Sequence, residues 1–504
     1  MTDPTKAIVI GAGLGGLAAA MRLGAKGYAV TVIDRLDRVG GRGSSITKGG
    51  HRFDLGPTIV TVPQVYEKLW AACGRDFHAD VKLIPLDPFY EIRWPDGANF
   101  YATGDTKIME TEIARLNPAD VPGYRRFLED ARRRYVVGFE GMVAKPMHRL
   151  WDTLKVLPTF GLLRADQSIL KLAQKRVSDE RLRMALSFHP LFIGGDPMHV
   201  TSMYALVSHL EKEFGVHYAM GGVQAIADAM ARVLEDQGGE IRLGTDVDEI
   251  VVEGGRATGV RVGGHVWRAP VVVSNADAGH TFHKLLRNHP RRGWSRAGKG
   301  RRWSMSLFVW YFGTEGTRDL WRDVGHHTIL SGPRYEGLLR DIFITGKLAD
   351  DMSLYLHRPS VTDPTVAPAG GDTFYALSPV PHLGHGGVNW SEEGAAYKRK
   401  VARVLNDTIP GFRDHMTEEV VFTPETFRDR YRSPFGAGFS LEPRILQSAW
   451  FRPHNVTRIP GLYLTGAGTH PGAGVPGVVS SAEVLDRLIP DAERPVQEIK
   501  VAAE

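Results

Sequence analysis

Cysteine is almost absent from this sequence, and long apolar runs are absent altogether. The 504 residues include one cysteine, Cys73, which excludes an intramolecular disulfide and disfavours a cysteine-rich metal site. No apolar run reaches the roughly 18 residues that a transmembrane helix needs. No metal-ligand motif and no catalytic nucleophile stands out either. These absences predict a protein that is cytoplasmic or peripheral to a membrane and binds no metal.

The composition is that of an ordinary folded protein. Hydrophobic residues make up 43% of the chain and charged residues 24%, which is not the composition of a disordered chain. A length of 504 residues leaves room for two or three domains and a large core. The formal net charge of +5 favours anionic surfaces only weakly.

A strand, a glycine-rich turn and a helix are predicted near the N-terminus. Residues 7–10 form a short β-branched run, as expected of a strand buried on both faces of a parallel sheet. In the turn that follows, Gly11 permits the tight bend, Gly13 lets the backbone approach a pyrophosphate, and Gly16 lets helix and strand pack closely. The helix N-terminus offers free N–H groups to the phosphates. This order predicts a dinucleotide-binding βαβ unit.

A second strand at 30–33 ends on Asp34, 18 residues after Gly16. That spacing is close to the one expected of a carboxylate that binds an adenosine ribose. The alternatives are an ordinary βαβ turn with surplus glycine and a secretory signal peptide. The immediate second strand and the lack of a small-residue cleavage site argue against the signal peptide.

The residues after Asp34 indicate which dinucleotide binds. In the Arg-Val-Gly-Gly-Arg sequence at 38–42, the glycines keep the backbone open, and Arg42 can reach back to a pyrophosphate as a planar cation. Residues 53–58 have the pattern of a turn that brings backbone toward the cofactor. The glycine fingerprint alone is also compatible with NAD, but the extension favours FAD. The whole succession resembles the glutathione-reductase-like FAD flavoproteins, in the branch that holds amine oxidases, protoporphyrinogen oxidases and carotenoid desaturases.

The predicted fold class is α/β, with a discontinuous Rossmann-like FAD-binding domain of the glutathione-reductase/amine-oxidase type, a second mixed-sheet substrate domain and a helical cap. Alternating strands near 81–101 with a Pro-Asp-Gly turn predict a hairpin, and a buried strand at 271–277 predicts that the chain re-enters the first sheet. Apolar strands at 307–312 and 373–377 predict a second sheet that forms the floor of a pocket. The predicted division of the chain is 1–80, 215–285 and 455–492 for the FAD-binding domain, 105–214 for the helical cap and membrane-contact region, 81–104 and 286–454 for the substrate-binding domain, and 493–504 for a polar tail.

Two segments have compositions that suit contact with a surface. Residues 150–173 mix leucines, Trp151 and Phe160 with lysines, as interfacial helices do, although an amphipathic helix packed on the protein's own core is the alternative. Residues 287–303 carry seven cations and no acid. Anionic lipid headgroups and a plain solvated loop are both compatible with this segment. Nucleic acid is disfavoured because no nucleic-acid-reading module accompanies the charges.

A second glycine-rich loop lies near the C-terminus. A strand ends at Gly466, residues 470–477 form a tight loop, and a helix follows from about Val478. Such a loop brings backbone N–H groups and a positive helix end to one place, where they can favour the negative charge of a reduced flavin. A glycine-rich structural turn is the alternative. His470 is the one ionisable side chain inside the loop, and a structural role for it is at least as well supported as a chemical one.

Nearly the whole chain, from Ile8 to Glu483, resembles the bacterial-type phytoene desaturases. Besides the nucleotide motif, the stretches that carry the resemblance are 423–427, 436–440, 447–455 and the terminal GAGTHPGAGVPGV. The resemblance implies FAD, a C40 polyisoprenoid hydrocarbon (phytoene) taken from the bilayer, and peripheral membrane attachment. The residues that it places at the FAD are Gly11, Gly13, Gly16, Asp34, Arg42, Pro57, Thr58, Val247 (through its backbone, at the adenine), Gly466, Ala467, Val475 and Pro476. Many relatives have glutamate where this chain has Asp34, but the shorter side chain should still reach the ribose.

The family implies stepwise desaturation of phytoene to neurosporene or lycopene. A hydride would pass from an allylic carbon to the flavin and a proton would leave the neighbouring carbon, so the cofactor carries the difficult chemistry. A hydrocarbon has no polar handle, so its affinity must come from buried apolar area, at about 25 cal/mol per Å². Oxygen or a quinone would reoxidise the flavin, and no nucleic-acid partner is expected.

Asp152 and Lys155 are the candidate catalytic side chains, because related desaturases have an Asp-x-x-Arg/Lys pattern there that has been considered for proton handling or cation stabilisation. An i,i+3 ion pair on a helix surface is the favoured alternative for these two residues. Two other functions remain open on the same fold. One is a carotenoid isomerase or hydroxycarotenoid desaturase, and the other is a non-catalytic carrier of isoprenoid lipids. A carrier would not need an intact FAD site at both ends of the chain.

Overall fold

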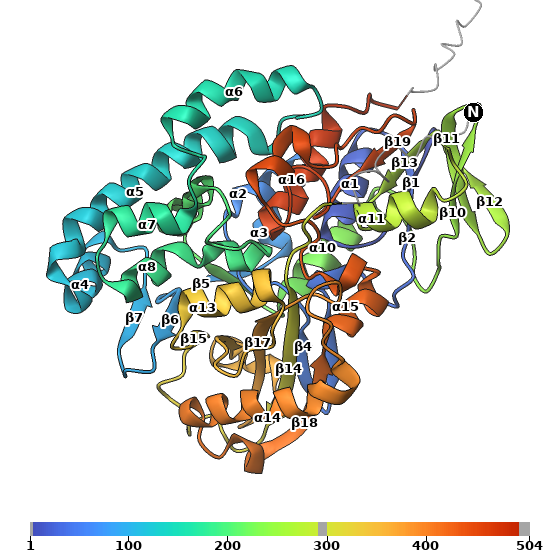
Figure 1. Ribbon diagram of the computed structural model, residues 1–504. Coiled ribbons are helices and arrows are strands. Elements are labelled where there is room, and N and C mark those ends of the chain that lie inside the picture. The colour runs from blue at the N-terminus through green and yellow to red at the C-terminus, as the bar shows by residue number, and fades with distance from the viewer. Residues whose placement is uncertain (1–3, 291–299, 493–504) are drawn as a thin grey trace, which may run out of the picture.

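The computed structural model describes residues 4–290 and 300–492 (Figure 1). The polar tail predicted at 493–504 and the central part of the basic segment 287–303 lie outside the described residues. Within them, the chain forms two large sheets, several small ones and a group of helices, as the predicted α/β class requires.

The first sheet joins strands that lie far apart in the sequence. Its five strands are all parallel, in the order β19 (Leu462–Leu464), β13 (Val271–Ser274), β1 (Lys6–Ile10), β2 (Ala29–Ile33) and β9 (Glu240–Arg242). The central strand is β1, where Ile8 pairs with Val272 on one side and Thr31 on the other. The predicted re-entry of the chain into this sheet near residue 271 is therefore confirmed.

Both faces of this sheet are covered, which explains why β1 is apolar from Ala7 to Ile10. Successive side chains of a strand point to opposite faces. Ala7 and Val9 pack among α1 (Leu14–Ala25), α10 (Val223–Asp236) and α16 (Val475–Asp486), whereas Ile8 and Ile10 pack toward a small antiparallel sheet. The strands of that small sheet are β10 (Glu249–Glu253), β11 (Arg256–Val262) and β12 (His265–Arg268). The helices α2 (Gln64–Ala72) and α3 (Phe77–Asp80) extend the helical side.

The second sheet has seven strands and mixed pairing. Their order is β18 (Met416–Phe422), β14 (Ser306–Thr314), β17 (Asp372–Val380), β16 (Leu354–His357), β15 (His327–Leu330), β6 (Tyr90–Arg93) and β7 (Asn99–Ala102). The pair β15–β6 is parallel, and the other neighbours are antiparallel. The predicted Pro-Asp-Gly hairpin is the turn between β6 and β7. The strand expected at 81–84 is instead β5 (Leu83–Pro85), which pairs with β8 (His217–Ala219).

The two faces of the second sheet have different neighbours. On one face, Phe308 and Trp310 of β14 and Phe374 of β17 form an aromatic core with α14 (Trp390–Thr408). On the other face, Leu307, Val309 and Tyr311 of β14, with Tyr375 of β17, line a cavity. The period-two alternation therefore gives one strand a packed face and a cavity face. The two strands predicted at 307–312 and 373–377 therefore do line the cavity.

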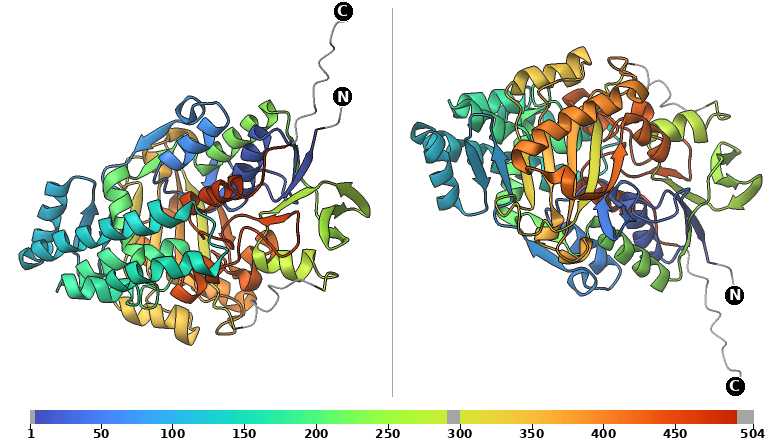
Figure 2. Two further views of the ribbon diagram at one scale, coloured as in Figure 1. Left: turned by 90° about the horizontal axis from the view of Figure 1, so that it is seen from above. Right: turned by 90° about the horizontal axis from the view of Figure 1, so that it is seen from below.

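The chain between β7 and β8, at 103–216, is described throughout and contains helices and loops but no strand. Its α-helices are α4 (Thr106–Leu116), α5 (Val121–Tyr135), α6 (Leu150–Leu162), α7 (Ile169–Arg176), α8 (Glu180–Ser187) and α9 (Leu206–Phe214). Side-chain oxygens of Asp105, Ser168 and Asp179 accept backbone N–H groups at the starts of α4, α7 and α8. Both views in Figure 2 show these helices on the side of the molecule opposite to β10–β12.

The remaining elements lie close to the second sheet or between the sheets. They are β3 (Ser45–Lys48), β4 (His51–Asp54), α11 (Ala278–His280), α13 (Tyr335–Arg340) and α15 (Pro424–Tyr431). None of the helices within 4–290 and 300–492 is both long and apolar enough to cross a membrane.

Candidate functional site

The two glycine-rich ends of the chain touch each other. A Cβ built on Gly15, in the first turn of α1, would lie 3.1 Å from the Cα of Gly466, which follows β19. Between them lies Asn275, just after β13, whose Nδ2 donates to the carbonyl oxygen of Gly11 at 3.4 Å. The glycine turn after β1 and the loop after β19 therefore lie side by side.

The N-terminal turn leaves backbone exposed to a cavity and has no room for side chains. Gly11 has a φ of +97°, which residues with a side chain rarely adopt. A Cβ on Gly16 would lie 2.0 Å from the carbonyl oxygen of Gly11. The glycine pair at 40–41 lies against this turn, since the N–H of Gly40 donates to the carbonyl oxygen of Ala12 at 2.8 Å. The Gly-Gly-Arg sequence at 40–42 thus lies beside the glycine turn that follows β1.

Asp34 and Arg42 both line the cavity next to this turn. The Asp34 carboxylate accepts the N–H of Ala12 at 2.7 Å and that of Leu36 at 2.8 Å, while burial raises its pKa. The Arg42 guanidinium donates from Nη2 to Ser433 Oγ at 2.9 Å and lies 5.8 Å from the ring centre of Tyr431. Burial lowers the pKa of Arg42. Its Nε is buried and has no partner among the described residues, so the guanidinium keeps a donor for an anionic group.

The C-terminal loop is held by a buried arginine. Arg452 donates to the carbonyl oxygens of Ala467 at 2.7 Å, Thr469 at 3.2 Å and Leu441 at 3.3 Å. His470 is also buried, and its Nε2 donates to the carbonyl oxygen of Met142 at 3.3 Å. Burial lowers the pKa of His470 to about 4, so the imidazole is neutral near pH 7. The backbone after it leads into α16, whose first turn faces the cavity.

One cavity of ≈ 860 Å³ connects these features. Of the predicted FAD-contacting residues, those that line it are Gly11, Gly13, Asp34, Arg42, Pro57, Thr58, Val247, Gly466, Ala467, Val475 and Pro476. Gly16 does not line the cavity but packs against Gly11 behind the turn, in agreement with its predicted packing role. Asp152 and Lys155 on α6 do not line it either, and the Lys155 side chain is exposed. A catalytic role for these two residues stays a prediction.

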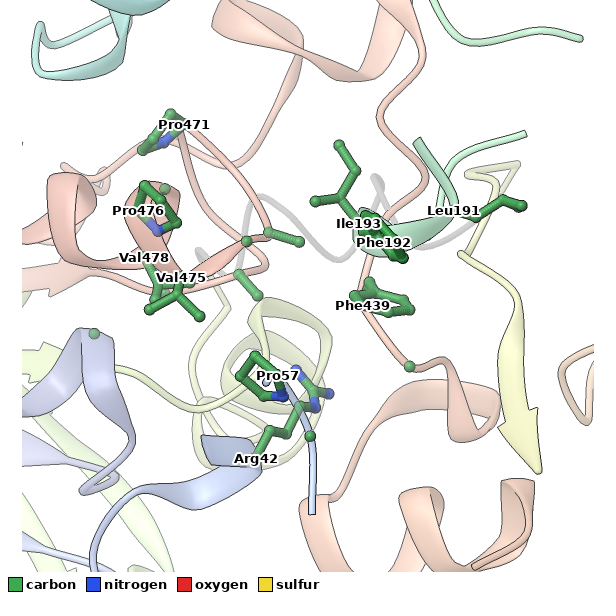
Figure 3. A pocket seen from close by; sticks show the side chains of 18 of the residues that line it. Arg42, Pro57, Leu191, Phe192, Ile193, Phe439, Pro471, Val475, Pro476 and Val478 are labelled. Atoms are coloured by element: carbon green, nitrogen blue, oxygen red, sulfur yellow. The ribbon is translucent and has the colours of Figure 1, made fainter. Parts of the chain in front are cut away.

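Away from the glycine turns, most of the side chains in the cavity wall are apolar. Figure 3 shows three groups of lining residues around the cavity: Arg42 with Pro57, then Pro471, Val475, Pro476 and Val478, and then Leu191, Phe192, Ile193 and Phe439. The floor is the second sheet, and residues of α6, α8 and α9 contribute to the wall as well. The site therefore combines a polar part of exposed backbone with a larger hydrocarbon-like part.

Several residues of the site carried no recognisable sequence signal. Asn275 was expected only as the end of a strand. His189 and Glu211 line the cavity and are hydrogen-bonded to each other at 3.0 Å, although 22 residues separate them. Tyr355 also lines the cavity, and its hydroxyl is 2.7 Å from Thr58 Oγ1. These pairings depend on tertiary structure, so no spacing rule could find them.

Three buried histidines form a cluster next to Tyr355. His326, His327 and His357 each place one ring nitrogen within 4.8 Å of the others, a donor set that could hold a metal ion. The Nε2 atoms of His326 and His357 are 3.1 Å apart, and the Tyr355 hydroxyl contacts His327 Nδ1 at 2.5 Å. His357 reaches the pair across the β15–β16 ladder, where it lies opposite His327. No metal site was predicted from the sequence, and no spacing of these histidines indicated the cluster.

Acid should destabilise the protein through these histidines. Burial lowers the pKa of His326 to about 3, and lowers those of His327 and His357 as well. An unfolded imidazole takes up a proton below about pH 6.5, so between these pKa values the unfolded state binds more protons and stability rises with pH. We expect a loss of up to about 1.4 kcal/mol per pH unit for each imidazole on acidification.

The measurement is the thermal unfolding midpoint as a function of pH. The variant His326→Gln should show a flatter dependence below about pH 6.5 than the unchanged protein. The matched control is His265→Gln, at an exposed position in β12, which should leave the pH dependence as it is. Equal slopes for all three proteins would contradict the expectation.

Comparison with known proteins identifies the class of protein. A model of the flavin containing amine oxidoreductase family matches residues 14–483, and the chain belongs to this family. The chain is 65% identical to a phytoene desaturase (neurosporene-forming) of Cereibacter sphaeroides, over 99% of this chain and 98% of the relative. It is 44% identical to a phytoene desaturase (lycopene-forming) of a Paracoccus species, over 96% of this chain and 97% of the relative.

Solved structures show the same fold at low sequence identity. An oxidoreductase from Methanosarcina mazei covers 96% of this chain and all of its own, with a TM-score of 0.66 and 18% identity. A putrescine oxidase variant covers 96% of this chain and 98% of its own, with a TM-score of 0.61 and 17% identity. The predicted fold class is confirmed, and the cofactor of the family, FAD, is the one that the sequence predicts.

The residues present fit FAD. Glycines of the turn after β1 and of the loop after β19 line the cavity at positions where a side chain would be crowded or strained. Arg42 keeps a buried donor that has no partner within the described part of the chain. Asp34 lies at the end of β2, where a ribose-binding carboxylate is expected. The N-terminus of α16 adds a positive helix end from the other side of the cavity.

Proposed function

We propose that this chain is a phytoene desaturase that introduces double bonds stepwise, with neurosporene as its main product and lycopene as a further one. The observation that carries the proposal is the identity of 65% to a neurosporene-forming relative over 99% of the chain. The cavity supports it, because apolar side chains of the second sheet and the helical segment continue directly from the FAD turns. A hydrocarbon could gain its affinity there from buried apolar area alone.

The FAD contacts proposed above are part of this proposal. Gly11, Gly13 and Arg42 would hold the pyrophosphate and Asp34 the ribose, while Val475 and Pro476 at the start of α16 would lie at the flavin. Bound FAD supplies the acceptor for a hydride. The chain's own contribution is to orient the hydrocarbon, exclude water and receive the proton. The division into a discontinuous FAD-binding domain, a cap and a substrate domain is proposed with it, supported by the pairing of β1, β13 and β19.

The test uses purified, flavin-loaded protein with phytoene in liposomes and with oxygen or a quinone as the proposed electron acceptor. We expect coloured products, and chromatography should identify neurosporene ahead of lycopene. An isomerase would change the geometry of a coloured carotenoid without adding double bonds, and a hydroxycarotenoid desaturase would act only on hydroxylated substrates. A carrier would bind phytoene without bleaching the flavin under anaerobic conditions. Any of these three results would refute the proposal.

We also propose that α6 contacts the bilayer. Large apolar side chains are exposed on it: Leu150 (47%), Trp151 (64%), Leu154 (39%), Leu157 (48%) and Leu162 (87%). The same helix contributes Thr153, Phe160 and Gly161 to the cavity wall. A lipid-soluble substrate could therefore pass from the membrane beside α6 into the cavity, which is consistent with the position of α6 at the edge of the molecule (Figure 1).

Replacing exposed residues of α6 should weaken membrane binding. Burying one large apolar side chain contributes about 1.5–3 kcal/mol, so the double variant Trp151→Ser and Leu162→Ser should bind liposomes at least about tenfold less tightly. Co-sedimentation with liposomes measures this. The matched control carries Leu320→Ser and Val361→Ser, at positions that are 53% and 43% exposed elsewhere, and should bind as the unchanged protein does. Equal losses in both double variants would refute the contact.

A further inference from the structure

Three buried polar side chains are hydrogen-bonded to one another at the wall of the cavity, and two of them line it. His189 belongs to a short turn (His189–Ile193) after α8, Glu211 to α9, and Tyr90 to β6 of the second sheet. All three are at most 5% exposed. His189 and Glu211 line the cavity among residues such as Phe188, Phe192 and Leu210. A carboxylate in such surroundings needs partners, because an unpaired buried charge is strongly disfavoured.

The hydrogen bonds define the state of the imidazole. Glu211 Oε2 accepts from Tyr90 at 3.1 Å and lies 3.0 Å from His189 Nε2. With Glu211 as a carboxylate, His189 Nε2 must be the protonated nitrogen that donates to it. His189 Nδ1 is then the basic nitrogen, and it is buried without a partner among the described residues. A carboxylate that fixes the tautomer of an imidazole and leaves its other nitrogen free is the arrangement of a general base.

The other carboxylates that line the cavity in the described part of the chain have different surroundings. Asp34 accepts two backbone N–H groups in the glycine turn. Asp166 is exposed and paired with an arginine, Asp246 is paired with another, and Asp277 faces the charge of Arg42. Glu211 is therefore the cavity carboxylate that holds an imidazole, and it does so in the apolar part of the wall.

We propose that His189, oriented by Glu211, accepts the proton that phytoene loses in each desaturation, an inference that rests on the proposed function. Loss of a hydride to FAD breaks one C–H bond of the hydrocarbon and removes two electrons. The C–H bond of the neighbouring carbon then breaks, its electron pair becomes the new C=C bond, and its proton goes to His189 Nδ1. The imidazolium is stabilised by Glu211, and the proton later leaves to solvent. Tyr90 is a positioning residue for Glu211.

The decisive variant is His189→Gln, whose amide can still donate to Glu211 but cannot accept the proton. A general base contributes about 10²–10⁴-fold, so anaerobic flavin reduction by phytoene should slow by at least about 100-fold. Flavin content and the affinity for bound carotenoid, measured by the flavin absorbance change, should stay as in the unchanged protein. The matched control is His51→Gln, a buried histidine outside the cavity wall whose Nδ1 is 3.0 Å from Thr373 Oγ1, and it should reduce at the normal rate.

A pH profile separates a proton acceptor from a merely structural residue. The titratable groups around His189 are Glu211, Tyr90 and, next to Tyr90, Tyr124. Burial raises the pKa values of both tyrosines, so both stay protonated over the pH range in which the rate is measured. In the unchanged protein a proton-accepting side chain should make the reduction rate depend on pH, and in His189→Gln this dependence should disappear.

The outcomes are distinct. If the unchanged protein does not desaturate phytoene, the proposed function itself fails. If it does, and His189→Gln reduces its flavin as fast as His51→Gln does, His189 is not the acceptor. A slow His189→Gln that has also lost flavin or carotenoid binding would show a structural role and overturn the inference. Glu211→Gln should give an intermediate rate, and an unchanged rate there would refute the role of Glu211.

Discussion

The variant Gly16→Ala should lose its flavin. The added Cβ would lie 2.0 Å from the carbonyl oxygen of Gly11, a backbone atom that cannot move without opening the turn between β1 and α1. Overpacking of this kind costs about 1–3 kcal/mol even where side chains can adjust. We expect FAD to dissociate at least about tenfold more readily, which corresponds to about 1.4 kcal/mol of binding free energy. The flavin-to-protein absorbance ratio after gel filtration measures the loss.

The chain offers a matched control for this variant. Gly394 also lies near the start of a helix, α14, but a Cβ there would meet only a ring carbon of Trp390 at 4.0 Å, an ordinary contact. Alanine is favoured over glycine inside a helix by about 1 kcal/mol, so Gly394→Ala should be at least as stable as the unchanged protein and keep its flavin. A flavin-loaded Gly16→Ala would mean that the turn does not bind the cofactor in the manner proposed.

The second large effect is expected from Arg452→Met. The Arg452 guanidinium is fully buried and is the hydrogen-bond donor to carbonyl oxygens of the C-terminal loop, at Ala467 and Thr469, and of Leu441. A buried carbonyl left without a donor costs about 1–3 kcal/mol, so together these losses should release the loop. We expect both a lower unfolding temperature and weak flavin retention, measured by the fluorescence of released flavin on heating.

Arg358→Met separates the loss of stability from the loss of the site. Arg358 is as deeply buried as Arg452, and its guanidinium binds both carboxylate oxygens of Asp372, at 3.0 and 2.8 Å. Removing one partner of a buried ion pair costs about 3–5 kcal/mol. This variant should therefore unfold at a lower temperature as well, but the folded fraction should keep its FAD because Arg358 does not line the cavity. Similar flavin loss in both variants would show that Arg452 acts only through global stability.

Local patterns were enough to predict the nucleotide-binding part of the fold. The strand at 7–10, the glycine turn and Asp34 follow one another within a short stretch, so their geometry depends mainly on neighbouring residues. The return of the chain at β13 could be predicted because a buried parallel strand is a short β-branched run. The role of β5 could not, since its partner β8 is supplied by a segment more than 130 residues later.

The polar groups of the cavity could not be predicted from sequence patterns either, because their partners lie in other segments of the chain. His189 and Glu211 meet only after α8 and α9 have packed, and His357 joins His326 only through the pairing of β15 and β16. Asp152 and Lys155 are predicted from the resemblance to related desaturases, and the structure places them on α6 at positions that do not line the cavity. Spacing along a helix gives the relative face of two residues but not what that face contacts.

The order of strands in the first sheet has a consequence for how the protein matures in the cell. Strand β19 and helix α16 come from residues 462–486, and they complete the nucleotide-binding sheet and its helical cover that begin with β1 at residue 6. A ribosome must therefore translate the chain through residue 486 before the nucleotide can be captured. Until then the apolar wall of the cavity is incomplete and exposed, so nascent chains should depend on chaperones. Because bound flavin stabilises the folded state, flavin supply should influence the yield of mature protein.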